Sequence, residues 1–93
     1  SEINFKEQEI LISSFRLDAL LSSALKLSRK QASQLIEKKS VQVNYQPAEK
    51  IDYIIAEGDL ISVRKFGRLK VIKNNGQTKK DKIKLTVQLL LSK

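Results

Sequence analysis

Residues 27–44, LSRKQASQLIEKKSVQVN, change their hydrophobic period in the middle, and this change decides the fold. Ser28 and Gln31 form the S-x-x-Q pattern of a capping box, which marks where a helix begins. Further along, Val41 and Val43 alternate with polar residues at the period of two that a strand requires. The stretch therefore predicts a short helix that leads directly into a strand. The core-facing residues expected on the helix are Ala32, Leu35 and Ile36.

A second helix is predicted immediately upstream, in residues 13–28, SSFRLDALLSSALKLS. Its Leu and Ala residues recur at i, i+3, i+4, i+7 and i+8, which is one stripe of an amphipathic helix. Ser14 is the expected N-cap, and Asp18 lies near the positive end of the helix. Because only Lys26 and Leu27 separate this stripe from the next capping box, we expect a helix-turn-helix-like pair.

The rest of the chain has the patterns of strands and turns. Turns are predicted around Pro47, which acts as a breaker, and at residues 57–59, while the polar residues 73–82 predict a mobile hairpin or loop. Alternation of apolar and polar residues predicts strands at 9–13, 60–66 and 82–90. The expected inward residues of the last strand are Ile83, Leu85, Val87 and Leu89. The predicted fold class is α+β, with the helix pair packed on a small, mostly antiparallel sheet.

Length and composition exclude most kinds of enzyme. The 93 residues suit one small domain, and no apolar run approaches the roughly 20 residues that a membrane span needs. Without Cys or His there is no disulfide, no usual zinc site and no Ser/His or Cys/His nucleophile. We therefore expect no catalytic residues, no metal and no cofactor, in a monomer located by default in the cytoplasm. Because Met is absent even at position 1, we also expect an excised piece of a longer protein, with an N-terminal domain as a potential partner.

The net charge of +8 is concentrated in one part of the chain. Residues 1–61 carry 8 Lys/Arg and 9 Asp/Glu, whereas residues 62–93 carry 10 Lys/Arg and a single acid, Asp81. This asymmetry predicts a surface for phosphates or anionic lipids, with a solvated basic face as the alternative.

The order of these signals resembles that of the S4 RNA-binding domain. The matching motifs are R-L-D at 16–18, L-S-R-x-x-A-x-x-L-I at 27–36, V-x-V-N at 41–44 and G-D-x-I-x-V-R at 58–64. Tyr45 and the segment RKFGRLKV at 64–71 are similar to the C-terminal S4 domain of bacterial cell-division-associated S4 proteins and their photosynthetic relatives. Two residues depart from the family pattern, since Lys39 and Tyr45 stand where S4 domains often have Gly.

The resemblance implies a single S4-like (αL) RNA-binding domain over residues 1–93, with a motif core at 16–64 and flanking strands at 9–13 and 82–90. It also implies a concave, positive surface that recognises structured RNA, either ribosomal RNA or tRNA, on the ribosome. The aromatic residues are scattered, which favours reading of shape and phosphates over stacking on a single strand. The expected RNA-binding residues are Arg16, Ser28, Arg29, Lys30, Ser33, Gln34, Lys38, Lys39, Gln42, Asn44, Tyr45, Arg64, Lys65, Arg68, Lys70, Lys82 and Lys84.

Alternatives remain open at this point. Arg29 could pair with Asp18, the stem of Arg16 could cover core, Asn44 could hydrogen-bond its own turn, and Phe66 could pack in the core. Two other functions compete with RNA binding by the isolated domain. The chain could be the targeting domain of an RNA-modifying enzyme whose catalytic domain is absent, or a basic module for a protein or membrane surface.

Overall fold

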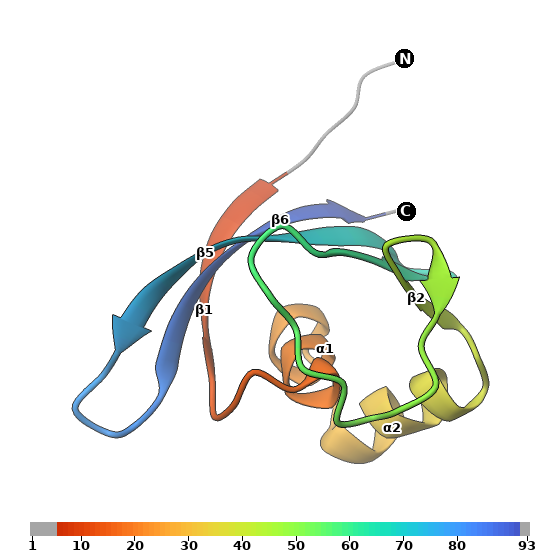
Figure 1. The fold of residues 1–93 in the computed structure, drawn as a ribbon, viewed down its shortest axis with the longest axis horizontal. Helices are drawn as coiled ribbons and strands as arrows, with labels where there is room; N and C mark the ends of the chain where they lie inside the picture. The colour runs from red at the N-terminus through yellow and green to blue at the C-terminus, as the bar shows by residue number, and fades with distance from the viewer. Residues whose placement is uncertain (1–5, 92–93) are drawn as a thin grey trace.

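The structure is a computed structural model and describes residues 6–91. Its elements, in chain order, are β1 (Lys6–Ile12), α1 (Leu17–Leu25), α2 (Arg29–Glu37), β2 (Val41–Val43), β3 (Gln46–Pro47), β4 (Leu60–Val63), β5 (Gly67–Gln77) and β6 (Ile83–Leu91). The strands form one antiparallel sheet in the order β1-β6-β5-β4-β2-β3, and both helices lie on the same side of it (Figure 1). The predicted α+β fold is confirmed.

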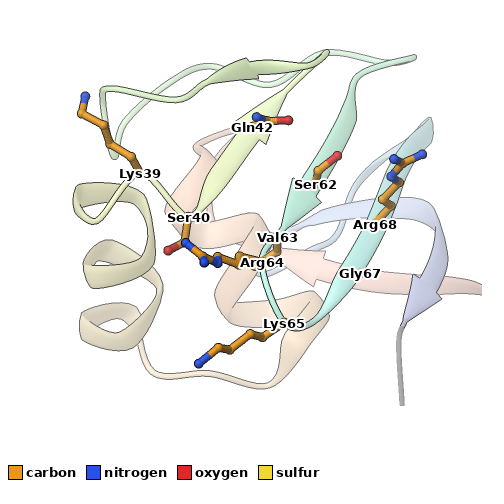
Figure 2. Close-up of a pocket in the computed structure, with 9 residues that line it drawn as sticks. All are labelled: Lys39, Ser40, Gln42, Ser62, Val63, Arg64, Lys65, Gly67 and Arg68. Carbon is orange, nitrogen blue, oxygen red and sulfur yellow. The ribbon is translucent and has the colours of Figure 1, made fainter.

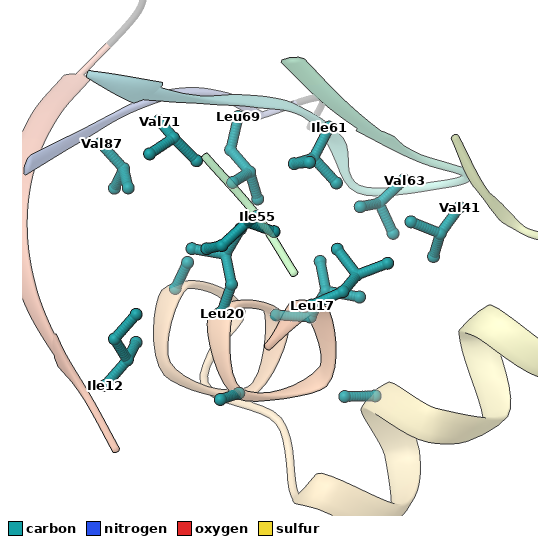
Figure 3. Close-up of a cluster of buried hydrophobic side chains, with 14 of the residues drawn as sticks. Ile12, Leu17, Leu20, Val41, Ile55, Ile61, Val63, Leu69, Val71 and Val87 are labelled. Atoms are coloured by element: carbon teal, nitrogen blue, oxygen red, sulfur yellow. The ribbon is translucent and has the colours of Figure 1, made fainter. Parts of the chain in front are cut away.

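The core lies between this face of the sheet and the helix pair. Leu17, Leu20 and Leu21 of α1 are fully buried, and Figure 3 shows Leu17 and Leu20 directed toward the strands. Ile55, from the segment between β3 and β4, fills the space between the helix and the sheet. The predicted inward side of β6 is confirmed, because its four alternating apolar residues are all buried. On α2, Ala32 and Ile36 are buried as predicted, whereas Leu35 is only partly buried.

The two helices begin in different ways. The predicted capping box of α2 is confirmed, since Ser28 Oγ accepts from the Gln31 backbone N–H and Gln31 Oε1 accepts from the Ser28 N–H, both at 3.0 Å. Ser14 does not cap α1, so that prediction is wrong; the N-cap is Arg16, without a side-chain cap. Instead the backbone N–H groups of Leu17 and Asp18 donate to carbonyls of the segment between β3 and β4, at 2.9 and 3.1 Å. A distant segment thus satisfies the free N–H groups of this helix end.

Both helices end on a lysine in the left-handed backbone region. Lys26 has φ 58° after α1, and Lys39 has φ 60° after α2. The N–H of Lys39 donates to the carbonyl of Ile36, and the N–H of Ser40 donates to that of Leu35, which is the Schellman arrangement. Position 39 therefore adopts the conformation that glycine favours, although the chain places Lys there.

The segments around β3 and β5 differ from the sequence prediction. Pro47, expected to lie in a turn and to interrupt the strand, instead joins Gln46 in the edge strand β3, where the missing N–H costs little. The predicted hairpin at 73–82 is present, but its turn is confined to residues 78–82, where Thr78 N–H donates to the Lys82 carbonyl at 2.7 Å; residues 73–77 are not loop and continue β5. Pairing with β6, with two register shifts, outweighs the turn preference of the Asn-Gly pair.

Candidate nucleic-acid interface

A hollow of about 470 Å³ lies on the side of the sheet away from the core, beside the C-terminal end of α2 (Figure 2). It is formed by the start of β2, the end of β4, the β4–β5 turn and the start of β5. We call it the cationic pocket. Its lining residues are Lys39, Ser40, Gln42, Ser62, Val63, Arg64, Lys65, Gly67 and Arg68.

The floor of the cationic pocket is a row of polar side chains that the sheet register aligns. Gln42 of β2 is opposite Ser62 of β4, and Ser62 is opposite Arg68 of β5. Figure 2 shows the three side chains side by side across neighbouring strands. They point outward because their neighbours Val41 and Val63 point into the core, as the period of two requires. Alternation within three strands therefore builds the polar floor.

Cations surround this floor. Within the part of the chain that the structure describes, the lining contains Lys39, Arg64, Lys65 and Arg68 and no acidic residue. The backbone N–H of Arg64 donates to the Ser40 carbonyl at 2.8 Å, which ties the β4–β5 turn to the start of β2. Several like charges around one hollow produce a positive potential, which an anion would relieve. Arginine can hold a phosphate with two parallel hydrogen bonds, whereas lysine acts as a point charge.

Tyr45 is linked to the cationic pocket through Arg68. The guanidinium carbon of Arg68 lies 5.9 Å from the centre of the Tyr45 ring, within the range of a cation–π contact. Tyr45 and Asn44 form the two-residue turn between β2 and β3, with φ of 71° and 50°. Positive φ at both positions is typical of a type I′ hairpin turn. Tyr45 is 65% exposed, so its side chain can still meet a ligand.

Asn44 holds this turn against the next strand. Its Nδ2 donates to Asp59 Oδ1, and its Oδ1 accepts from the backbone N–H of Leu60, both at 3.0 Å. The alternative that Asn44 bonds its own turn is therefore wrong, because both partners belong to the segment that enters β4. The side chain positions Tyr45 by anchoring the turn.

Arg16 and Arg29 meet at a buried carboxylate. Asp18 Oδ2 accepts from Nη2 of both arginines at 3.0 Å, and Asp18 Oδ1 accepts from Arg16 Nε at 3.1 Å. The Asp18 side chain is only 4% exposed, whereas those of Arg16 and Arg29 are 37% and 48% exposed. Burial raises the pKa of Asp18, but the hydrogen bonds and positive charges of Arg29 and Arg16 lower it by more. The net result is a pKa below its ordinary value of 3.8. The alternative that Arg29 pairs with Asp18 is thus confirmed, and the side chains of both arginines remain partly exposed.

The predicted site residues fall into several places. The cationic pocket gathers Lys39, Gln42, Arg64, Lys65 and Arg68, to which Ser40 and Ser62 must be added. Ser62 was recognisable as the outward residue between two buried ones. Ser40 was not recognisable, because its place depends on the helix end. The remaining predicted residues are Ser28 in the capping box, Lys30, Ser33, Gln34 and Lys38 on or beside α2, and Lys70 on β5.

Lys82 and Lys84 do not join the cationic pocket. Lys84 is opposite Leu11 of β1, whereas the β6 residue opposite Arg68 is Leu90. Lys84 and Leu90 are six positions apart along the strand, which is roughly 20 Å. These two lysines therefore form a separate basic region near the β5–β6 hairpin, which projects from the left of the fold in Figure 1.

Residues 6–91 contain neither a metal-binding cluster nor a membrane-spanning helix. No group of His, Cys, Asp or Glu in this range is arranged to hold a metal ion. No helix in the same range has the length and apolar character to cross a membrane.

Comparison with known proteins agrees with the fold. The family model of the S4 domain matches residues 15–61. The chain is 43% identical over 77 residues to the ribosome-associated protein quality control protein P2 of Bacillus subtilis (strain 168). The match covers 83% of this chain and 30% of that relative, so the chain spans less than a third of the relative's length. On the motif order, the helix pair on an antiparallel sheet and these matches, the chain belongs to the S4 domain family.

Proposed function

We propose that this chain is an RNA-binding module that recognises structured ribosomal RNA or tRNA on the ribosome. The observation that carries the proposal is the cationic pocket, in which Lys39, Arg64, Lys65 and Arg68 surround a polar floor without an acid among the described lining residues. Membership in the S4 domain family and the ribosome association named for the Bacillus subtilis relative support the same function.

Phosphate recognition explains the arrangement best. The exposed side of the sheet offers guanidinium, ammonium, amide and hydroxyl groups, which are the groups that proteins use to hold phosphate and ribose. Tyr45 adds one aromatic face at the margin of the pocket. Such a surface reads the shape and backbone of folded RNA, with little discrimination among bases.

The outward side of α2 can extend the surface. Lys30, Gln34 and Lys38 are exposed, and Arg29 leaves about half of its side chain accessible while it holds Asp18. The apolar stripes of both helices are occupied by the core, which argues against a membrane-surface role. The cell-division association, an N-terminal partner domain, the monomeric state and the cytoplasmic location stay predictions.

The proposal is tested by measuring the affinity of the chain for protein-free ribosomal RNA, for tRNA and for vesicles of phosphatidylglycerol over a range of salt. We expect binding to at least one RNA that weakens linearly on a log–log plot against salt. If roughly five phosphates are contacted, the slope should be about −4 to −5, using the duplex DNA coefficient. Equal affinity for the vesicles, or RNA binding that ignores salt, would overturn the proposal.

A further inference from the structure

A second, smaller cavity of about 220 Å³ lies between α2 and the β4–β5 turn. Leu27, Leu35 and Phe66 provide apolar walls, and amide and ammonium groups occupy the rest of the lining. It is smaller than the roughly 300–1,000 Å³ of typical small-molecule sites, so it admits one ring system but no whole cofactor. We call it the side cavity. Its complete lining is Leu27, Gln31, Gln34, Leu35, Lys38 and Phe66.

The side cavity adjoins the cationic pocket through two short pieces of chain. Lys38 lines the side cavity and the next residue, Lys39, lines the cationic pocket. Likewise Lys65 lines the cationic pocket and Phe66 lines the side cavity. The two hollows are thus neighbours at the end of α2 and the β4–β5 turn, and a polymer with a charged backbone and flat side groups can occupy both at once.

The walls of the side cavity are held in place. Phe66 packs against the core, and its backbone N–H donates to the Val63 carbonyl at 3.0 Å, which fixes the β4–β5 turn. Gln31 Oε1 is engaged by the capping box of α2. A flat ligand would therefore meet an aromatic ring that is already ordered, so binding would cost the protein little conformational entropy.

Gln34 provides the polar group that can read the ligand. Its side chain is exposed at the rim, and over residues 6–91 it makes no hydrogen bond within the protein. A glutamine amide offers a donor and an acceptor side by side, and this pair matches the adenine edge that carries N6 and N7. Proteins recognise unpaired bases with this combination of an apolar wall and a hydrogen-bonding group.

We propose that the side cavity receives one unpaired nucleobase, with adenine preferred, of an RNA whose adjacent phosphates occupy the cationic pocket. This inference rests on the proposed function. The occupant is a base rather than an apolar protein side chain because the described lining of both hollows is cationic without any acid, which complements a polyanion. The domain then distinguishes a bulged or looped RNA from a continuous duplex.

The test uses three versions of one short RNA hairpin, measured by titration at a single salt concentration. The first carries a one-nucleotide adenosine bulge, the second carries an abasic bulge at the same place, and the third is fully paired. Stacking of a base on an aromatic side chain predicts that the adenosine bulge binds on the order of tenfold more tightly than the abasic bulge.

Two substitutions assign this preference to the side cavity. Gln34→Ala changes an exposed side chain, and Phe66→Leu keeps an apolar group against the core while removing the ring. Each should reduce the preference for the adenosine bulge over the abasic bulge to within about threefold while retaining salt-dependent binding to all three hairpins. Gln46→Ala, an exposed glutamine on β3 outside both hollows, is the matched control and should retain the preference.

The outcomes separate the two proposals. Salt-dependent binding that is equal for all three hairpins would overturn the base site and leave the proposed function standing. Retention of the full preference in both Gln34→Ala and Phe66→Leu would also overturn the base site. Absence of salt-dependent binding to any hairpin, to ribosomal RNA and to tRNA would overturn the proposed function itself.

Discussion

Arg29 Nη2 lies 3.0 Å from Asp18 Oδ2, so the first residue of α2 is tied to the first turn of α1. The carboxylate is buried, and Arg16, the N-cap residue of α1, contacts the same oxygen. One acid therefore fixes the relative placement of both helices and holds two arginines near the surface. Removing the acid should therefore lower the stability of the fold before it lowers the affinity for any ligand.

Asp18→Asn should lower the free energy of unfolding by about 1–3 kcal/mol, because it weakens charge-assisted hydrogen bonds to Arg16 and Arg29 in a buried position. Urea denaturation followed by circular dichroism measures the change. The control is Glu49→Gln, which removes an exposed ion pair with Lys39 at 3.9 Å and should cost at most about 1 kcal/mol. Equal losses of unfolding free energy in the two variants would show that the buried carboxylate contributes no more to stability than the exposed ion pair.

The stabilisation from Asp18 should depend on pH in the acid range. Because the pKa of Asp18 in the folded protein is below 3.8, the unfolded chain binds this proton more readily than the folded one. The contribution is therefore complete above about pH 4 and is lost as the pH falls toward the folded pKa. Urea midpoints measured between neutral pH and pH 3 should fall more steeply for the natural chain than for Asp18→Asn. Parallel curves would contradict the depressed pKa.

Lys39→Gly should stabilise the fold and weaken RNA binding at the same time. Glycine relieves the left-handed strain at φ 60°, of about 1–2 kcal/mol, and this exceeds its entropic cost of about 0.5–1 kcal/mol. Lys26→Gly is the matched control, since Lys26 has φ 58° but does not line the cationic pocket. Both variants should show higher urea midpoints, whereas only Lys39→Gly should lose affinity for ribosomal RNA. A loss of affinity in both would mean that helix-end lysines act through net charge alone.

Arg68→Ala should cost more RNA affinity than the double change Lys82→Ala and Lys84→Ala. Arg68 lines the cationic pocket and lies 5.9 Å from the Tyr45 ring, while the two lysines are on the other part of the sheet. We expect Arg68→Ala to weaken binding by about 1.5–3 kcal/mol and to reduce the salt slope by about one. Filter binding at two salt concentrations, with the fold checked by amide spectra, measures both effects. If the lysine double variant loses more affinity, the main RNA surface lies near the β5–β6 hairpin instead.

Patterns that involve near neighbours in the chain were determined by the sequence alone. The capping box from Ser28 to Gln31 and the inward series of β6 form as predicted, because each depends on residues at most a few positions apart. The same applies to the polar exposure of Gln42 and Ser62, which follows from their buried neighbours. The existence of a helix pair on an antiparallel sheet was therefore predictable.

Contacts between residues that are distant in the sequence were decided only by the tertiary structure. The free N–H groups of α1 find carbonyls more than thirty positions away, so no local signal could replace the expected Ser14 cap. Asn75 donates to Thr86 and Glu9 from two other strands, and this pairing keeps residues 73–77 in β5 against their preference for a turn. The cationic pocket exists because register places β2, β4 and β5 beside the end of α2. Long-range hydrogen bonds and packing act between residues whose proximity is created by the fold, and for this reason a local pattern cannot contain them.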